Sequence, residues 1–96
     1  MKREEVVKLI TEHRPDLERL GMKSLAVFGS VARGEARAGS DIDILVEFEG
    51  TPSFDQYMDL KFYLEDLLNS RVDLVTADAL KPRMRPIVER EAVRVA

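Results

Sequence analysis

The sequence contains no cysteine and no tryptophan, and it has one histidine, four prolines and five glycines among 96 residues. The absence of cysteine excludes disulfides and thiolate metal sites, and it is compatible with the cytoplasmic location that we expect. No apolar run approaches the roughly 20 residues of a membrane-spanning helix. The first 13 residues are charged and amphipathic and lack the apolar core of a signal peptide, so we expect no contact with a membrane.

Apolar residues make up 45% of the chain and charged residues 34%, which is typical of a soluble globular protein. The length corresponds to one domain, which we expect to span residues 1–96. The net charge of −3 argues against non-specific binding to nucleic acid, and we expect no direct nucleic-acid contact. That charge does not argue against a nucleotide held through a metal ion.

The spacing of apolar residues predicts helices that alternate with strands. Such an order indicates the α/β (α+β) class, with a single sheet and helices packed on it. Pro82 is expected to open the last helix, and Pro86 to break or kink it. The predicted helices are 3–13 with a further turn at 16–20, 31–35, 54–68 and 81–91, and the predicted strands are 23–28, 41–48, 71–76 and, at an edge, 92–95.

Two aspartates one residue apart, Asp41 and Asp43, begin the apolar strand predicted at 41–48. Residues i and i+2 of a strand project from the same face, so both carboxylates are expected to point into one small volume. Two such charges repel by about 4 kcal/mol at 4 Å when the effective dielectric constant is near 20. A divalent cation between them would offset this repulsion, and Mg²⁺ prefers carboxylate oxygens, water and substrate phosphates.

A third acid, Asp73, interrupts the apolar alternation of the strand predicted at 71–76. If this strand pairs beside the strand at 41–48, three carboxylates cluster on one face. That arrangement suits a site in which two metal ions catalyse phosphoryl transfer. The alternative is that Asp73 is an acid at the edge of the sheet, paired with Arg71 or a lysine.

Gly29 and Ser30 stand where the first strand is expected to turn into a short helix. A glycine allows the backbone to approach a phosphate, and the helix that follows presents unpaired N–H groups. The Ser30 hydroxyl can donate to a phosphate oxygen, and Arg33, one turn later, can reach a triphosphate. The alternative is a plain turn in which Ser30 caps the helix.

These residues together resemble the nucleotidyltransferase superfamily of DNA polymerase beta type in its minimal form, the MNT domain. The pattern of that family is Gly-Ser, ten residues, Asp-x-Asp and then a separate Asp on a later strand. In this chain Gly29 and Ser30, then Asp41 and Asp43, and finally Asp73 match it. The minimal subgroup also tends to read Gly-Ser-x-Ala-Arg-Gly, matched at 29–34, and Ser-Asp-x-Asp, matched at 40–43.

The resemblance implies a mixed sheet of three to four strands with flanking helices, the polymerase beta-like nucleotidyltransferase fold. It implies transfer of a nucleoside monophosphate from a nucleoside triphosphate to a hydroxyl group, with two Mg²⁺ ions and release of pyrophosphate. Asp41, Asp43 and Asp73 would be the catalytic residues and the metal ligands. The nucleotide-binding residues would be Gly29, Ser30, Arg33 and Ser40.

The resemblance also implies a partner, because minimal nucleotidyltransferases are often antitoxins of HEPN ribonuclease toxins. We expect the chain to transfer AMP from ATP to a hydroxyl, on a tyrosine, of a cognate HEPN toxin. One alternative is an antitoxin that masks the toxin by binding alone. Another is a nucleotidyltransferase that acts on a small molecule or an RNA end. The terminal strand would leave an open sheet edge. A second subunit can pair with such an edge, so a homo-oligomer is one possible assembly.

Overall fold

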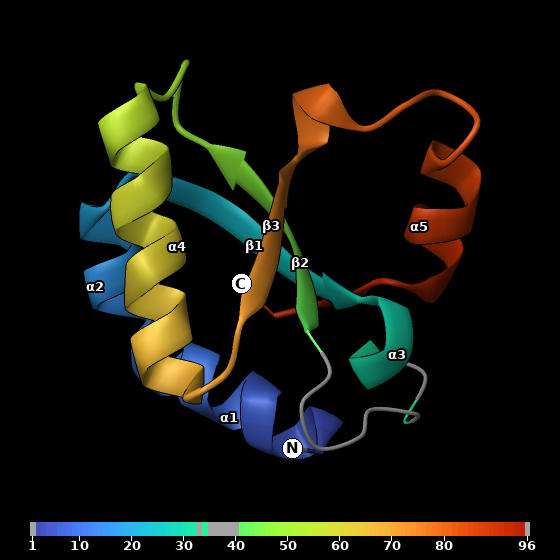
Figure 1. Ribbon diagram of the computed structural model, residues 1–96, viewed down its shortest axis with the longest axis horizontal. Coiled ribbons are helices and arrows are strands. Elements are labelled where there is room, and N and C mark those ends of the chain that lie inside the picture. The colour runs from blue at the N-terminus through green and yellow to red at the C-terminus, as the bar shows by residue number, and fades with distance from the viewer. Residues whose placement is uncertain (1, 33, 35–40, 96) are drawn as a thin grey trace.

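The computed structural model describes all residues except 1, 33, 35–40 and 96 (Figure 1). None of the described helices is both long and apolar enough to cross a membrane. The elements, in chain order, are α1 (Arg3–Glu12), α2 (Arg14–Arg19), β1 (Met22–Phe28), α3 (Gly29–Ala32), β2 (Ile42–Phe48), α4 (Phe54–Leu68), β3 (Val72–Thr76), the 3₁₀ helix η1 (Ala77–Ala79), α5 (Arg85–Glu91) and β4 (Val93–Arg94).

The strands form one mixed sheet in the order β3-β2-β1-β4. Strand β1 is antiparallel to both of its neighbours, β2 and β4, whereas β2 and β3 are parallel. Parallel neighbours need a long crossover, and α4 supplies it between β2 and β3 (Figure 1). The predicted mixed sheet with flanking helices is therefore confirmed, with four strands.

The two faces of the sheet differ in polarity because side chains alternate along each strand. One face carries the buried residues of β1, β2 and β3 and is covered by α1, α2 and α4, as Figure 1 shows. The other face carries Asp43, Leu45 and Glu47 of β2, and among the described elements η1 and α5 lie beside it. The fully buried side chains of the covered face and its helices are Val6, Ile10, Leu17, Leu25, Val27, Ile44, Val46, Leu60, Leu64 and Leu68.

Helix α4 has the bounds that its apolar spacing predicts. Its start is fixed by Ser53, whose hydroxyl accepts a hydrogen bond of 3.1 Å from the backbone N–H of Gln56. Its end is fixed by Asn69, which adopts the left-handed conformation with φ of 49°. Both ends of the crossover are thus set by local chemistry, and this fixes where β3 begins.

The starts of four other elements are corrected. The last helix begins at Arg85 and not near Pro82, because Pro86 fits in a first turn, where a missing N–H costs nothing, but not in a helix interior. The two strands that carry the acids begin one residue later than predicted, so that Asp41 precedes β2. The short helix predicted at 31–35 begins instead at Gly29, and residues 33 and 35 lie outside the described part.

Replacement of Leu64 tests whether α4 is anchored through its buried face. Leu64 is fully buried, and Leu64→Ala is expected to lower the free energy of unfolding by about 2–5 kcal/mol, because it leaves a cavity. Phe62 on the same helix is 52% exposed, so Phe62→Ala should cost less than about 1 kcal/mol. Urea denaturation followed by circular dichroism measures both values. Equal losses would contradict this assignment of the core.

Candidate active site

The parallel pairing of β2 and β3 places two of the predicted acids side by side. Asp43 and Asp73 are direct partners in the register, so their side chains leave the sheet on the same face. That face is the one opposite the helical core, and Asp43 is half-buried while Asp73 is exposed. Acids from two neighbouring strands thus lie on one face, but the expected cluster of all three carboxylates does not form among the described residues, because Asp41 precedes β2 and pairs with Arg71.

This juxtaposition is electrostatically unfavourable in itself. Neighbouring strands lie about 4.8 Å apart, so the two carboxylates start from adjacent positions. Like charges 4 Å apart repel by about 1 kcal/mol in water and about 4 kcal/mol at an effective dielectric constant of 20. The pair itself therefore adds no stability to the sheet.

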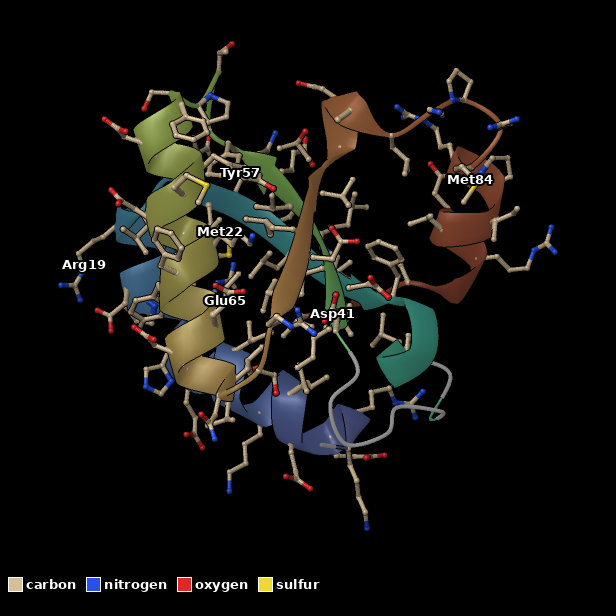
Figure 2. The ribbon with its side chains drawn as sticks, viewed as in Figure 1. Arg19, Met22, Asp41, Tyr57, Glu65 and Met84 are labelled. Carbon is tan, nitrogen blue, oxygen red and sulfur yellow. The ribbon has the colours of Figure 1, made fainter. Side chains whose placement is uncertain are left out.

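Asp41 lies at the same end of the sheet, one residue before β2 (Figure 2). Its Oδ1 atom is 3.5 Å from Nε of Arg71, which precedes β3, and the N–H of Ile42 donates to the Arg71 carbonyl at 2.9 Å. Within the described part of the chain, no three acidic or histidine side chains converge as a ready-made set of metal ligands. As placed, the Asp41 carboxylate belongs to an exposed ion pair.

Gly29 connects the predicted Gly-Ser turn to the acids. It has a φ of +71°, and a Cβ atom on it would lie 2.1 Å from Oδ2 of Asp43. The Asp43 carboxylate therefore occupies the space that any side chain at residue 29 would fill. The close approach follows from the register, because Phe28, the last residue of β1, is the partner of Asp43. The structure thus brings together Gly29, Asp43 and Asp73.

The other predicted nucleotide-binding residues are Ser30, Arg33 and Ser40. Arg33 and Ser40 lie outside the described residues. The backbone of Ser30 belongs to α3, directly after Gly29. Its position next to the acids is consistent with the predicted role of this turn, while the orientation of its hydroxyl is not described.

Two side chains of α4 to which the sequence analysis gave no role reach the outer edge of β3. The Tyr57 hydroxyl donates to the Leu74 carbonyl, and Oε2 of Glu65 accepts from the Val72 N–H at 3.1 Å. Both are labelled in Figure 2. Burial, and next the nearby Asp73 carboxylate, raise the pKa of Tyr57 above its ordinary value of 10.0. The only sequence signal for them is their polarity on a helix that also carries a core face.

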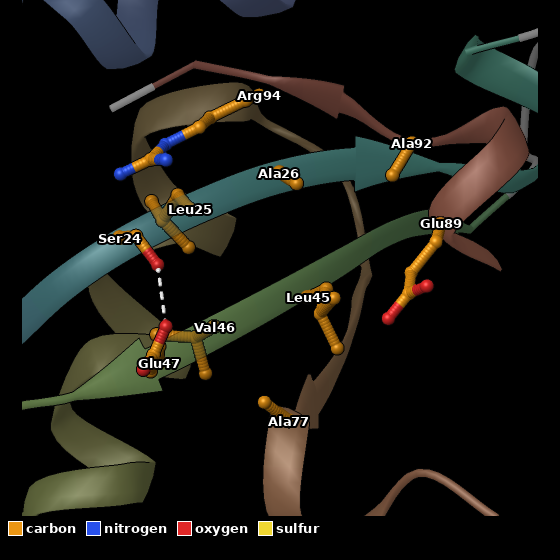
Figure 3. Close-up of a pocket in the computed structure, with 10 residues that line it drawn as sticks. All are labelled: Ser24, Leu25, Ala26, Leu45, Val46, Glu47, Ala77, Glu89, Ala92 and Arg94. Carbon is orange, nitrogen blue, oxygen red and sulfur yellow. Dashed lines mark hydrogen bonds between the residues drawn. The ribbon is translucent and has the colours of Figure 1, made fainter. Parts of the chain in front are cut away.

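A cavity of about 260 Å³ lies between β1, β2 and the C-terminal segment of the chain (Figure 3). Leu45, two residues after Asp43 on β2, forms part of its floor together with Ala26 of β1. Its walls are formed by Ala77 of η1, by Glu89 of α5 and by Ala92, which follows α5. The small apolar floor and the mixed rim make a surface on which a flat ring can lie, adjacent to the acidic site.

Comparison with known sequences identifies the family of the chain. The model of the nucleotidyltransferase domain family matches residues 10–95. A curated relative, protein adenylyltransferase MntA of Thermococcus cleftensis, is 47% identical over 93 residues, which are 96% of this chain and 94% of the relative. The alignment therefore includes all the residues discussed here except at the extreme ends.

Comparison with solved structures supports the fold. A structure described as a minimal nucleotidyltransferase is 43% identical, has a TM-score of 0.84, and is matched over 97% of this chain and 95% of its own. A structure of a tri-AMPylated HEPN toxin of Shewanella oneidensis with an MNT antitoxin has a TM-score of 0.67. It is 22% identical and is matched over 94% of this chain and 71% of its own, so it supports the fold alone.

The comparisons and the geometry agree. The family match covers every strand of the sheet, including those that carry Asp43 and Asp73. The predicted class of enzyme, a nucleotidyltransferase with the minimal fold, is thereby confirmed. The chain belongs to the nucleotidyltransferase domain family.

Proposed function

We propose that this protein transfers AMP from ATP to a tyrosine hydroxyl of a cognate HEPN toxin and thereby acts as its antitoxin. The observation that carries the proposal is the in-register pair Asp43 and Asp73 on the open face of the sheet, with Gly29 directly beneath Asp43. The 47% identity to a protein adenylyltransferase supports the class of reaction. We also propose that residues 1–96 form one minimal nucleotidyltransferase domain, since one sheet holds every described strand.

The donor set of the site suits Mg²⁺. Asp41, Asp43 and Asp73 offer hard carboxylate oxygens, and these are the protein ligands that Mg²⁺ takes together with water and phosphate. The exposed Asp41–Arg71 ion pair contributes little stability, so Asp41 can exchange Arg71 for a cation at small cost. Bound there, Mg²⁺ would neutralise phosphate charge and favour ionisation of the attacking hydroxyl.

The residues of the chain have separate roles in this reaction. The hydroxyl oxygen forms a bond to the α-phosphorus of ATP, and the bond between that phosphorus and the bridging oxygen of pyrophosphate breaks. Asp73, at the outer strand, accepts the proton of the hydroxyl, and pyrophosphate leaves with the electron pair. Gly29 and Ser30, at the opposite side of Asp43, hold the phosphates through their backbone. Positioning and charge supply most of the acceleration.

The cavity beyond the acids is assigned to the nucleoside of ATP. Its floor continues along the same strand face from Asp43 to Leu45, so a nucleotide whose α-phosphate lies at Asp43 can place its ring there. Small side chains such as Ala26 leave the space, and carboxylate and hydroxyl groups at the rim can contact the polar edge of a base.

Amide replacement of the acids tests the catalytic assignment. Asp43→Asn and Asp73→Asn are each expected to slow AMP transfer by about 100-fold or more, because each removes a charge that holds the metal and phosphate. Asp73→Asn should not lower stability, since it relieves a repulsion. Transfer is measured with α-³²P-labelled ATP, Mg²⁺ and a candidate HEPN toxin. Asp66→Asn, an exposed acid on α4, is the control.

Wild-type rates in both variants would contradict the assignment. A tight complex with the HEPN protein, together with no label transferred by the unaltered chain, would show instead an antitoxin that acts by masking. Chelation of divalent ions with EDTA distinguishes these results further, since it should abolish transfer but leave a masking complex intact.

Two glycines with similar backbone angles isolate the contact between Gly29 and Asp43. Gly34 has a φ of +75°, close to the +71° of Gly29, but within the described part of the chain no atom lies within 4 Å of the Cβ position of Gly34. Alanine at either site should strain the backbone by roughly 1–2 kcal/mol. Only Gly29→Ala should displace the Asp43 carboxylate, and we expect it to lower the transfer rate about 10-fold further than Gly34→Ala. Equal rates in the two variants would contradict a role for this contact.

Filling the cavity tests its assignment to the nucleoside. Ala26→Leu adds bulk to the cavity floor and is expected to raise KM for ATP about 10-fold, with a smaller effect on kcat. Ala79→Leu, on the exposed η1, is the control for the added side chain. An unchanged KM for ATP in Ala26→Leu would show that the nucleoside binds elsewhere.

A further inference from the structure

We propose that Tyr57 and Glu65 form a clamp that positions Asp73 for the reaction. The clamp is the pair of hydrogen bonds from α4 to the outer edge of β3, Tyr57 to the Leu74 carbonyl and Glu65 to the Val72 N–H. This inference rests on the proposed function, because it assigns Asp73 to the site. Neither residue contacts the reacting atoms, so both are positioning residues.

The clamp follows from the place of β3 in the sheet. Strand β3 is an edge strand, and it pairs only with β2 in the described sheet. The backbone groups of alternate residues in an edge strand point away from the sheet and lack a partner strand. At Val72 and Leu74 these groups meet side chains of α4 instead. Strand β3, which carries Asp73, is thus held on its outer side by α4 side chains in place of a neighbouring strand.

The two hydrogen bonds enclose Asp73 on both sides. Val72 precedes Asp73 and Leu74 follows it, so the residue on each side of the acid is tied to the helix by one hydrogen bond. Asp73 itself pairs in register with Asp43. Like charges at these positions repel, and this tends to push the edge strand away from β2. The clamp opposes that displacement, because it ties β3 to the core helix that packs against the sheet.

The Tyr57 hydroxyl also interacts electrostatically with the Asp73 carboxylate that it is proposed to position. This hydroxyl is partly buried and donates to the Leu74 carbonyl, and burial, followed by the nearby Asp73 carboxylate, raises its pKa. Loss of this donor removes a hydrogen bond but leaves the ring in place.

The same helix offers a matched control. Tyr63 lies on α4 and its hydroxyl donates to Oδ2 of Asp16 on α2, at 3.0 Å. Burial raises its pKa in the same direction as that of Tyr57. Tyr57→Phe and Tyr63→Phe therefore remove equivalent groups from one helix, and only the first touches β3. Asp66→Ala, next to Glu65 and exposed, is the corresponding control for Glu65→Ala.

The experiment measures the affinity for Mn²⁺ by electron paramagnetic resonance, and kcat and KM for ATP in AMP transfer. Tyr57→Phe and Glu65→Ala are expected to weaken Mn²⁺ binding about 10-fold and to lower kcat about 10- to 100-fold, with KM for ATP changed less than kcat. Tyr63→Phe and Asp66→Ala should match the unaltered protein. Glu65→Gln should restore both values, since its amide oxygen still accepts from the Val72 N–H.

Unchanged Mn²⁺ affinity and kcat in both Tyr57→Phe and Glu65→Ala would overturn the proposal. Dimerisation of Tyr57→Phe with unaltered Mn²⁺ affinity, seen by light scattering, would also overturn it and show that the tyrosine only guards the strand edge. If Tyr57→Phe does not fold, Glu65→Ala and Glu65→Gln decide the question alone. Failure of the proposed function gives a different pattern, in which the unaltered protein neither binds Mn²⁺ nor transfers AMP.

Discussion

The parallel pairing of β2 with β3 is the constraint on which the site depends. It places Asp43 and Asp73 in adjacent positions on the face that the core helices leave open. The same pairing is possible only because α4 carries the chain across the sheet between the two strands. Since the acids repel each other, the stability that holds them together comes from the apolar face of the same strands, where Ile44 and Leu74 are buried.

Helix α4 therefore has two functions in this small protein. Its apolar face, including Leu60, Leu64 and Leu68, closes the core. Its polar residues at the outer edge of β3, Tyr57 and Glu65, complete the hydrogen bonds of the strand that carries Asp73. A short chain can build a charged site at the edge of a sheet in this way, because one helix supplies both the packing and the missing edge partners.

Much of this architecture is visible in the sequence, for physical reasons that apply to particular residues. Ser53 and Asn69 give α4 its exact ends, because capping chemistry is local. The repeat of acids in Asp41, Asp43 and Asp73 is visible in the sequence and leads to the prediction of a nucleotidyltransferase, the class that the family match confirms. Gly29 stands out in the pattern, but the reason found in the structure, room for the Asp43 carboxylate, concerns a residue 14 positions later.

The remaining features depend on tertiary contacts. The direction of β3 beside β2 is not encoded in either strand alone. The ion pair of Asp41 with Arg71 arises only when the starts of the two strands meet. The start of α5 differs from the predicted one because Pro82 and Pro86 are both acceptable first-turn residues, and local preference does not decide between them. Tyr57 and Glu65 lack any local signal for their contacts with β3, which only the fold creates.

The central claim is that Asp43 and Asp73 act as one unit on a shared ligand. A double-mutant cycle on Mn²⁺ affinity, with Asp43→Asn, Asp73→Asn and the double variant, tests it most directly. The account predicts that each single variant weakens Mn²⁺ binding by about 10-fold or more, and that the double variant is little weaker than the worse single one. Losses that simply add, or an unaltered protein that does not bind Mn²⁺, would contradict it.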